Sequence, residues 1–280
     1  MSATKPDPSL LSRVLTALVL APLAILSVLY LPPAWFAALI GLVMLLGVWE
    51  WTRLIGVERL RFRCAVVLAN AALLLLVWFL LDRAHYVYIV EIGVVWWLLA
   101  LFWLGRFSFA QKATITNLEI KMVVGSLLFV PAWCAALLLR EGNASGPWWL
   151  LYVVILVWVA DIGAYFAGRR YGQHKLAPQI SPGKTREGVY GALAVSAAYA
   201  AVCGSQVGMP APAVVILAGL SLIVVLFSIV GDLFESLIKR HSNHKDSGSL
   251  LPGHGGILDR IDSLLAALPI FVVGKWLLNL

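Results

Sequence analysis

The sequence predicts an all-α, polytopic integral membrane protein with about nine transmembrane helices and a cytoplasmic N-terminus. Of its 280 residues, 61% are hydrophobic and only 12% are charged, and the mean hydropathy is +0.91. Soluble domains have about 45–50% apolar and about 25% charged residues, so this composition excludes a soluble protein. The other two observations are the spacing of the apolar segments and the distribution of basic residues between them.

The apolar segments are long enough to cross a bilayer, which takes about 20 residues per helix. The first segment is long for the apolar core of a signal peptide and no small-residue cleavage site follows it, so we interpret it as a span. The predicted spans cover residues 14–31, 34–52, 64–81, 86–104, 122–139, 147–168, 188–207, 211–231 and 263–280.

Two residue types fit this interpretation. The three cysteines lie in apolar surroundings without metal-ligand spacing, so they predict neither disulfides nor a zinc site. Tryptophans crowd the ends of the predicted spans, which is typical of interfacial belts. The tryptophans concerned are Trp35, Trp49, Trp51, Trp103, Trp148 and Trp149.

The basic residues predict the orientation. With a cytoplasmic N-terminus, the cytoplasmic segments contain all of the 21 Lys and Arg residues except Arg83, Arg140 and Lys275. Lys and Arg accumulate on the cytoplasmic side of membrane proteins, so nine spans place the N-terminus inside and the C-terminus outside. We divide the chain into N-terminal helices (1–121) and C-terminal helices (122–280), which carry two polar cytoplasmic loops at 168–187 and 232–262.

The acidic residues gather near these two loops. Asp161 lies about seven residues before the cytoplasmic end of its span, at a depth of roughly 10 Å. An ionisable group at that depth faces a polar cavity or a partner, so Asp161 either lines a site or pairs structurally, for example with Arg169. Asp232, Glu235 and Lys239 share one helix face at i, i+3 and i+7, which indicates either a solvated stripe or part of a site.

The stretch between Lys239 and Asp262 combines cations, acids and glycines. In GHGG, residues 253–256, the glycines permit positive φ and let backbone N–H groups approach an anion. Asp259 and Asp262 are three residues apart, so they could share a metal ion or cap a helix N-terminus. His254 could donate to a phosphate or brace the loop.

The other polar loop contains GKT at residues 183–185. A phosphate-binding P-loop requires Gly where Pro178 stands, so this is not a Walker A sequence. Lys184, Thr185 and Arg186 in a Pro/Gly turn nevertheless remain good phosphate ligands, although such basic loops are often only determinants of topology.

The residues 236–262, SLIKRHSNHKDSGSLLPGHGGILDRID, resemble the signature of the phosphatidate cytidylyltransferase (CDP-diacylglycerol synthase) family. The family pattern of S-x-x-K-R, K-D and P-G-H-G-G-x-x-D-R-x-D is filled at every fixed position. DIGAYFAGRRYG and ISPGKTREG are similar to the family's other polar segments, so the resemblance covers about residues 147–280.

The resemblance implies an enzyme of phospholipid biosynthesis in the cytoplasmic membrane of a bacterium, with its active site facing the cytoplasm. It would transfer CMP from CTP to phosphatidate, yielding CDP-diacylglycerol and diphosphate. The resemblance also implies Mg²⁺, with K⁺ as a candidate second ion, and a homodimer in the lipid bilayer; no nucleic acid partner is expected. The phosphate of phosphatidate is already anionic, so the chemistry requires cations that bring two polyanions together rather than a general base.

Carried over onto this chain, the resemblance implies metal ligation by Asp232 and Asp259, supported by Asp246 and Asp262, and we add Asp161 because of its depth. The predicted catalytic residues are Lys239, Arg240, Lys245, Asp246, His254 and Arg260. The predicted substrate-binding residues are Ser181, Lys184, Thr185, Arg186, Ser236, Gly255 and Gly256.

Two alternatives remain at this point. His241 and Asp246 fit H-x-x-x-x-D, a spacing that glycerolipid acyltransferases use, although two fixed residues are a weak signal. A transporter or flippase would bind anionic headgroups through its inner loops, but its charges belong nearer the midplane. The D-G-x-x-A-R motif of CDP-alcohol phosphotransferases is absent from the sequence.

Overall fold

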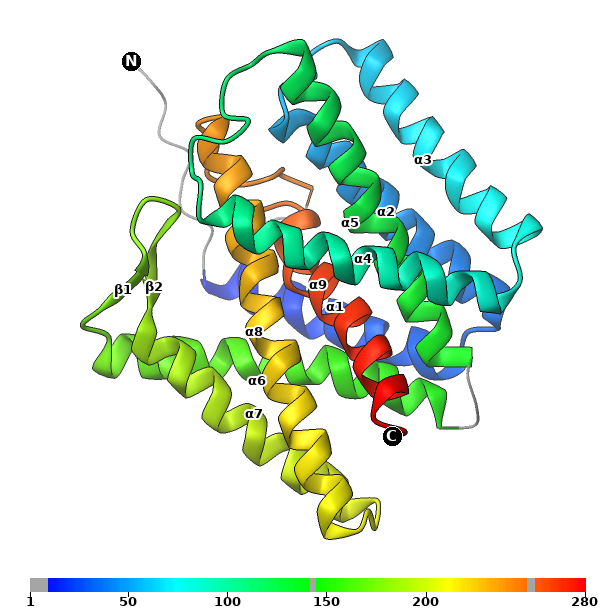
Figure 1. The fold of residues 1–280 in the computed structure, drawn as a ribbon, viewed down its shortest axis with the longest axis vertical. Helices are drawn as coiled ribbons and strands as arrows, with labels where there is room; N and C mark the ends of the chain where they lie inside the picture. Colours follow the sequence, from blue (N-terminus) through cyan, green and yellow to red (C-terminus); the bar gives the residue numbers. More distant parts are fainter. Residues whose placement is uncertain (1–9, 142–144, 251–254) are drawn as a thin grey trace.

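The computed structural model describes residues 10–141, 145–250 and 255–280, which form nine helices and one β-hairpin (Figure 1). Seven helices, α2 to α8, are long and apolar enough to cross a membrane; α1 has a shorter apolar stretch, and α9 carries Asp259, Arg260, Asp262 and Lys275. The predicted all-α, polytopic membrane fold is confirmed. The helices are α1 (Leu10–Tyr30), α2 (Pro33–Leu54), α3 (Leu60–Leu80), α4 (Arg83–Leu104), α5 (Ile115–Glu141), α6 (Gly146–Tyr171), α7 (Arg186–Gln206), α8 (Ala211–His241) and α9 (Leu258–Leu277).

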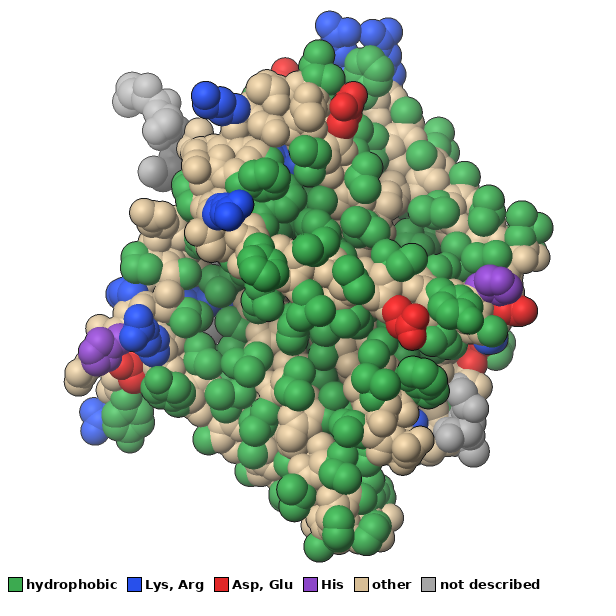
Figure 2. Space-filling view, in the orientation of Figure 1, with side chains coloured by type: hydrophobic (Ala, Val, Ile, Leu, Met, Phe, Trp, Pro, Cys, Tyr) green, Lys and Arg blue, Asp and Glu red, His purple; other side chains and the backbone are tan. Residues whose placement is uncertain are grey.

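The polar connections predicted on one membrane face lie at one end of the bundle, along the top and left of Figure 1. We call this the hairpin end; it comprises residues 55–59, 105–114, 172–185, 242–250 and 255–257. Arg240 Nε donates to Ile180 O (3.1 Å), and His241 Nε2 donates to Phe107 O (2.6 Å). The C-terminal end of α8 therefore binds two of these connections, residues 105–114 and 172–185, next to the connection 242–250 that follows it. Figure 2 shows the bundle's side covered mainly by hydrophobic side chains, with most charged groups near its margins.

At the opposite end, the two arginines predicted in outer loops have local partners. Arg140 Nε donates to Val28 O (2.8 Å), and its guanidinium also bonds Leu31 O. The last carbonyls of a helix lack intrahelical partners, so Arg140 satisfies the C-terminus of α1. Arg83 forms an ion pair with Glu141.

An aromatic cluster fills the core beneath the polar residues of α8. The ring of Phe234 stacks on Trp51 with centroids 6.3 Å apart, and it meets Trp96, Trp97 and Trp103 edge-on. Such geometry adds to the stabilisation that burial alone provides. Because Phe234 lies between Asp232 and Glu235 in the sequence, this packing fixes the rotation of α8 and with it the direction of those carboxylates.

The interfacial placement predicted for tryptophans is wrong for Trp51 and Trp103, which are only 1% and 7% exposed. Trp51 can be buried because its Nε1 donates to Lys121 O at 2.9 Å. Trp35 and Trp148 are exposed, as a belt requires.

Glycines bring α6 and α7 into direct backbone contact. A Cβ at Gly163 would lie 2.9 Å from Gly191 O, and one at Gly191 would lie 2.8 Å from Gly163 O. Small residues permit such close approach between membrane helices. Asp161, two residues before Gly163, is thereby held beside α7 and the hairpin that precedes it.

The segment predicted as a Pro/Gly turn folds as an antiparallel hairpin of β1 (Lys175–Ala177) and β2 (Ser181–Thr185). Thr185 ends β2 and caps α7, because its Oγ1 accepts a hydrogen bond from Gly188 N (3.1 Å). Glu187 accepts bonds from the backbone N–H groups of Gln173 and His174 on the other side of the hairpin. The hairpin is thus anchored at both ends of its base.

We expect Thr185→Val to lower the free energy of unfolding by about 1 kcal/mol, the usual cost of losing a helix N-cap. Thr185→Ser keeps the accepting hydroxyl and should behave like the wild type. Thermal melting of the detergent-solubilised protein measures the difference. Equal melting temperatures for the Val, Ser and wild-type proteins would show that the cap contributes nothing.

Candidate functional site

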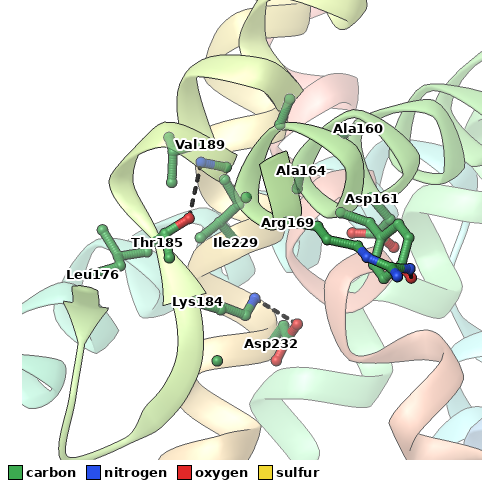
Figure 3. Close-up of a pocket in the computed structure, with 15 residues that line it drawn as sticks. Ala160, Asp161, Ala164, Arg169, Leu176, Lys184, Thr185, Val189, Ile229 and Asp232 are labelled. Atoms are coloured by element: carbon green, nitrogen blue, oxygen red, sulfur yellow. Dashed lines mark hydrogen bonds and ion pairs between the residues drawn. The ribbon is translucent and has the colours of Figure 1, made fainter. Parts of the chain in front are cut away.

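A cavity of about 380 Å³ opens between α6, the hairpin, α7 and α8 (Figure 3). Lys184 of β2 and Asp232 of α8 face each other in it, and Asp161 and Arg169 of α6 contribute further charges. The rest of its wall is largely apolar, with Ala160, Ala164, Leu176, Val189, Ala192 and Ile229. One cavity therefore combines ionic groups with an apolar lining.

The ionic part of the cavity centres on an ion pair between Lys184 and Asp232. The distance from Lys184 Nζ to Asp232 Oδ2 is 2.5 Å, and Ser236 Oγ donates to the other carboxylate oxygen at 3.2 Å. Asp161 interacts electrostatically with both members of the pair and with Arg260. Asp161, Lys184 and Asp232, three predicted site residues from three different elements, therefore interact electrostatically with one another.

A second, more buried ionic cluster surrounds Lys239. Its Nζ lies 2.5 Å from Glu235 Oε2 and 2.9 Å from Asp259 Oδ1. Asp259 also accepts bonds from the backbone N–H groups of Ser247 (3.1 Å) and Gly256 (2.8 Å). Asp262 is within electrostatic range of Asp232 and Lys239, so it joins this cluster to the cavity.

The glycines of the 253–256 motif that the structure describes surround Asp259. Gly255 has φ of +81°, which favours glycine, and a Cβ there would lie 2.7 Å from Asp259 Oδ2. The sequence predicted that backbone N–H groups of this motif approach an anion. In the structure the N–H of Gly256 donates to the carboxylate of Asp259. A role for Gly255 and Gly256 in substrate binding stays a prediction.

The remaining predicted residues occupy varied positions at the hairpin end. Arg240 braces the hairpin through Ile180 O, while Ser181 is partly buried in β2. His254 lies outside the described residues. The side chains of Arg186, Lys245, Asp246 and Arg260 are exposed.

Glu50 of α2 is a polar site residue that the sequence reasoning missed. It is 3% exposed, and its Oε2 accepts bonds from Ser247 Oγ (3.0 Å) and Leu258 N (2.8 Å). The available signal was a single acid inside an otherwise uncharged predicted span, 34–52. A buried ionisable group in such a segment is a sign of function.

The carboxylates suit Mg²⁺ chemically, although no group of three or more His, Cys, Asp or Glu side chains in the described part of the chain is arranged to hold a metal. Mg²⁺ takes one or two carboxylates and completes its shell with water and substrate phosphate oxygens. Asp232 and Asp259 each bind a lysine ammonium, so both positions already stabilise a positive charge. The donor set therefore fits the ion that the family resemblance implies.

The geometry does not support the acyltransferase alternative. His241 Nε2 is engaged by Phe107 O, and the hydrogen bonds of the described residues include none between His241 and Asp246. A catalytic His–Asp pair requires the carboxylate to orient the imidazole.

Comparison with known proteins gives a match over nearly the whole chain. Residues 11–277 match the model of the cytidylyltransferase family. The chain is 41% identical to a phosphatidate cytidylyltransferase of Pseudomonas aeruginosa over 94% of this chain and 96% of that protein. It is 36% identical to the enzyme of the same name from Haemophilus influenzae, over 92% and 96%. It is also 35% identical to a phosphatidate cytidylyltransferase of Bacillus subtilis, over 70% of this chain and 74% of that protein.

Proposed function

This chain belongs to the cytidylyltransferase family, and we propose that it transfers CMP from CTP to phosphatidate, forming CDP-diacylglycerol and diphosphate. The protein is a multi-pass membrane enzyme whose substrates are one soluble nucleotide and one membrane lipid. The observation that carries the assignment is the cavity in which Asp161, Lys184 and Asp232 face an otherwise mainly apolar wall. A lipid phosphate must reach cations while its acyl chains remain in hydrocarbon, and this lining suits both requirements.

The reaction is a substitution at the α-phosphorus of CTP. A phosphate oxygen of phosphatidate forms the new P–O bond, and the bond to the bridging oxygen of the β-phosphate breaks, so that diphosphate leaves. The nucleophile is already an anion, so the barrier arises from repulsion between the substrates and from charge on the leaving group. Lys184 and Lys239 carry ammonium donors at the cavity and in the adjacent cluster, where they can bind these phosphates.

We assign Mg²⁺ binding to Asp232 and Asp259, with Asp262 and Asp161 nearby. Bound Mg²⁺ supplies charge stabilisation at phosphate oxygens. Asp232 and Asp259 would hold the ion, and Lys184 and Lys239, which pair with them in the structure, would then be available to bind phosphate. K⁺ as a second ion and a homodimer remain predictions, which ion-dependent assays and analytical ultracentrifugation in detergent can check.

We place the hairpin end on the cytoplasmic side, where CTP is available, in the inner membrane of a bacterium. This placement rests on the excess of Lys and Arg in the connections of that end. A cysteine introduced at Gly183, which has open space around it, should react with a membrane-impermeant thiol reagent only from the cytoplasmic side.

Incubation of the purified protein with CTP labelled in its α-phosphate tests the function. Label should enter a chloroform-soluble product only when phosphatidate and Mg²⁺ are both present. Diacylglycerol, which lacks the nucleophilic phosphate, is the matched control lipid. No transfer in a preparation that is folded and inserted would contradict the proposal.

We expect Asp161→Asn to lower turnover about tenfold without unfolding the bundle, in the range seen for residues that support a metal site. The substitution keeps the shape but removes the charge that interacts with Lys184 and Asp232. Glu91→Gln is the control, since Glu91 is an acid within α4 and does not line this cavity. Equal turnover in both variants would make Asp161 a structural residue.

A further inference from the structure

Glu50 connects the N-terminal helices to the signature segment. It lies in α2 near the hairpin end, almost two hundred residues before its hydrogen-bond partner Ser247. Its carboxylate is buried, and no cation is among its hydrogen-bond partners in the described parts of the chain. The N-terminal helices thus contribute a charged group to a region that otherwise comes from α8, α9 and the residues between them.

Glu50 completes the N-terminus of α9. The residue at the N-cap position is Ile257, which makes no side-chain capping bond. Glu50 Oε2 accepts from the N–H of Leu258, the first residue of α9, at 2.8 Å. A carboxylate at a helix N-terminus is favourable because of the unpaired N–H groups and the helix dipole. A residue of α2 therefore provides the cap that the sequence around α9 lacks.

Ser247 joins Glu50 to the ionic cluster. Its hydroxyl donates to Glu50 Oε2 (3.0 Å) while its backbone N–H donates to Asp259 Oδ2 (3.1 Å), and Ser247 is completely buried. Asp259 in turn binds Lys239 (2.9 Å). A continuous polar path therefore runs from α2 through Ser247 to Asp259 and α8.

Two glycines give this carboxylate its room. A Cβ at Gly248 or at Gly256 would collide with the Glu50 carboxylate. The backbone of the signature segment therefore passes in direct contact with the Glu50 carboxylate at two places, Gly248 and Gly256. This contact explains the glycine at 256 without any ligand.

Stability alone does not account for Glu50. Its Oε1 is buried and has no hydrogen-bond partner among the described residues. Burying a carboxylate with an unsatisfied oxygen is unfavourable, and apolar residues of similar volume often replace buried charges without loss of stability. A role in organising the site explains this group better than a role in holding the fold together.

We propose that Glu50 is a positioning residue of the CMP transfer reaction. It fixes Ser247 and the first turn of α9, and thereby sets the direction of the Asp259 carboxylate toward Lys239. This inference rests on the proposed function, and it assigns no contact between Glu50 and either substrate.

Kinetics of Glu50→Gln, Ser247→Ala and the double variant test the proposal. We expect kcat to fall about 10- to 100-fold in Glu50→Gln, as for residues that orient metal ligands. The Mg²⁺ concentration for half-maximal rate should rise, while KM for phosphatidate stays close to that of the wild type. The effects of Glu50→Gln and Ser247→Ala should be less than additive because both break the same path. Glu119→Gln, an exposed acid in α5 near the same end, is the control.

Amide hydrogen exchange without substrate or Mg²⁺ provides a second measurement. Exchange at Ser247, Gly256 and Leu258 should accelerate in Glu50→Gln and remain unchanged in Glu119→Gln. Unchanged kcat in Glu50→Gln, beside an active wild type, would overturn the positioning role alone. A fall in kcat with an unchanged Mg²⁺ response and faster exchange throughout the chain would also overturn it. An inactive wild type would overturn the proposed function and this inference together; Ser247→Ala supplies the test if Glu50→Gln does not fold.

Discussion

Asp232→Asn should reduce CMP transfer about 10³-fold, the upper range for loss of one charge-stabilising group at a reacting phosphate or acyl centre. Asparagine keeps the size of the side chain and can still accept the bond from Ser236, but it cannot neutralise Lys184 or provide an anionic ligand for Mg²⁺. Turnover of labelled CTP across a Mg²⁺ titration measures the effect. Thermal melting and gel filtration in detergent confirm that the variant remains folded.

Asp82→Asn is the matched control for this experiment. Asp82 caps α4 by accepting from His85 N at 3.2 Å, and asparagine caps helices about equally well. Asp259→Asn should also lose nearly all turnover, with an additional change at the backbone of Ser247 and Gly256, whose N–H groups it binds. Mg²⁺-dependent turnover close to wild type in Asp232→Asn would remove Asp232 from the metal ligands.

Lys239→Met should lose both stability and turnover. It would leave Glu235, which is 4% exposed, and Asp259 next to each other without their shared cation. Breaking a buried ion pair by removing one partner costs about 3–5 kcal/mol. We therefore expect a clearly lower melting temperature, together with a loss of turnover about as large as that of Asp232→Asn.

A second substitution separates the two effects of Lys239. The double variant Lys239→Met/Glu235→Gln also removes the negative charge of the buried Glu235. Its melting temperature should therefore return toward that of the wild type, while its turnover should stay as low as in Lys239→Met. Lys112→Met is the control, because Lys112 is exposed at the same end of the bundle. Arg59→Ala and Arg61→Ala should likewise have small effects. Recovery of turnover in the double variant would show that Lys239 serves the fold and not the substrate.

The helices could be predicted because hydropathy acts over whole segments. Each predicted span is about 20 residues long and mainly apolar. Seven of the nine correspond to helices that are long and apolar enough to cross a membrane, α2 to α8, whereas α1 has a shorter apolar stretch and α9 carries charged residues near both ends. Trp51 shows the limit of this reasoning, since an indole near a span end suits the membrane interface and the protein core equally well. Only the partner carbonyl of Lys121, 70 residues away, decides between them.

The candidate site could be predicted in its residue types but not in its pairings. The signature, residues 236–262, includes Lys239 and Asp259, and Asp232 lies seven residues before Lys239 on the same predicted helix face. The ion pair between Lys184 and Asp232 depends on the fold of a hairpin that the Pro and Gly residues did not reveal. Glu50 has no motif around it, so its connection to Ser247 follows only from the packing of α2 against the signature segment.

The charges of α9 bear on how the protein is assembled in the membrane. Asp259, Arg260 and Asp262 lie within the first five residues of α9, and Lys275 lies in its last turn, so the charges stand at the two ends of its apolar stretch. Ionisable groups in such segments pair with other polar groups of the protein. During synthesis α9 follows the other eight helices, so its acids can find Lys239 and the Ser247 backbone already in place. Docking of α9 then brings together the carboxylates of α8 and α9, so we expect the proposed site to be completed in one late step of biogenesis.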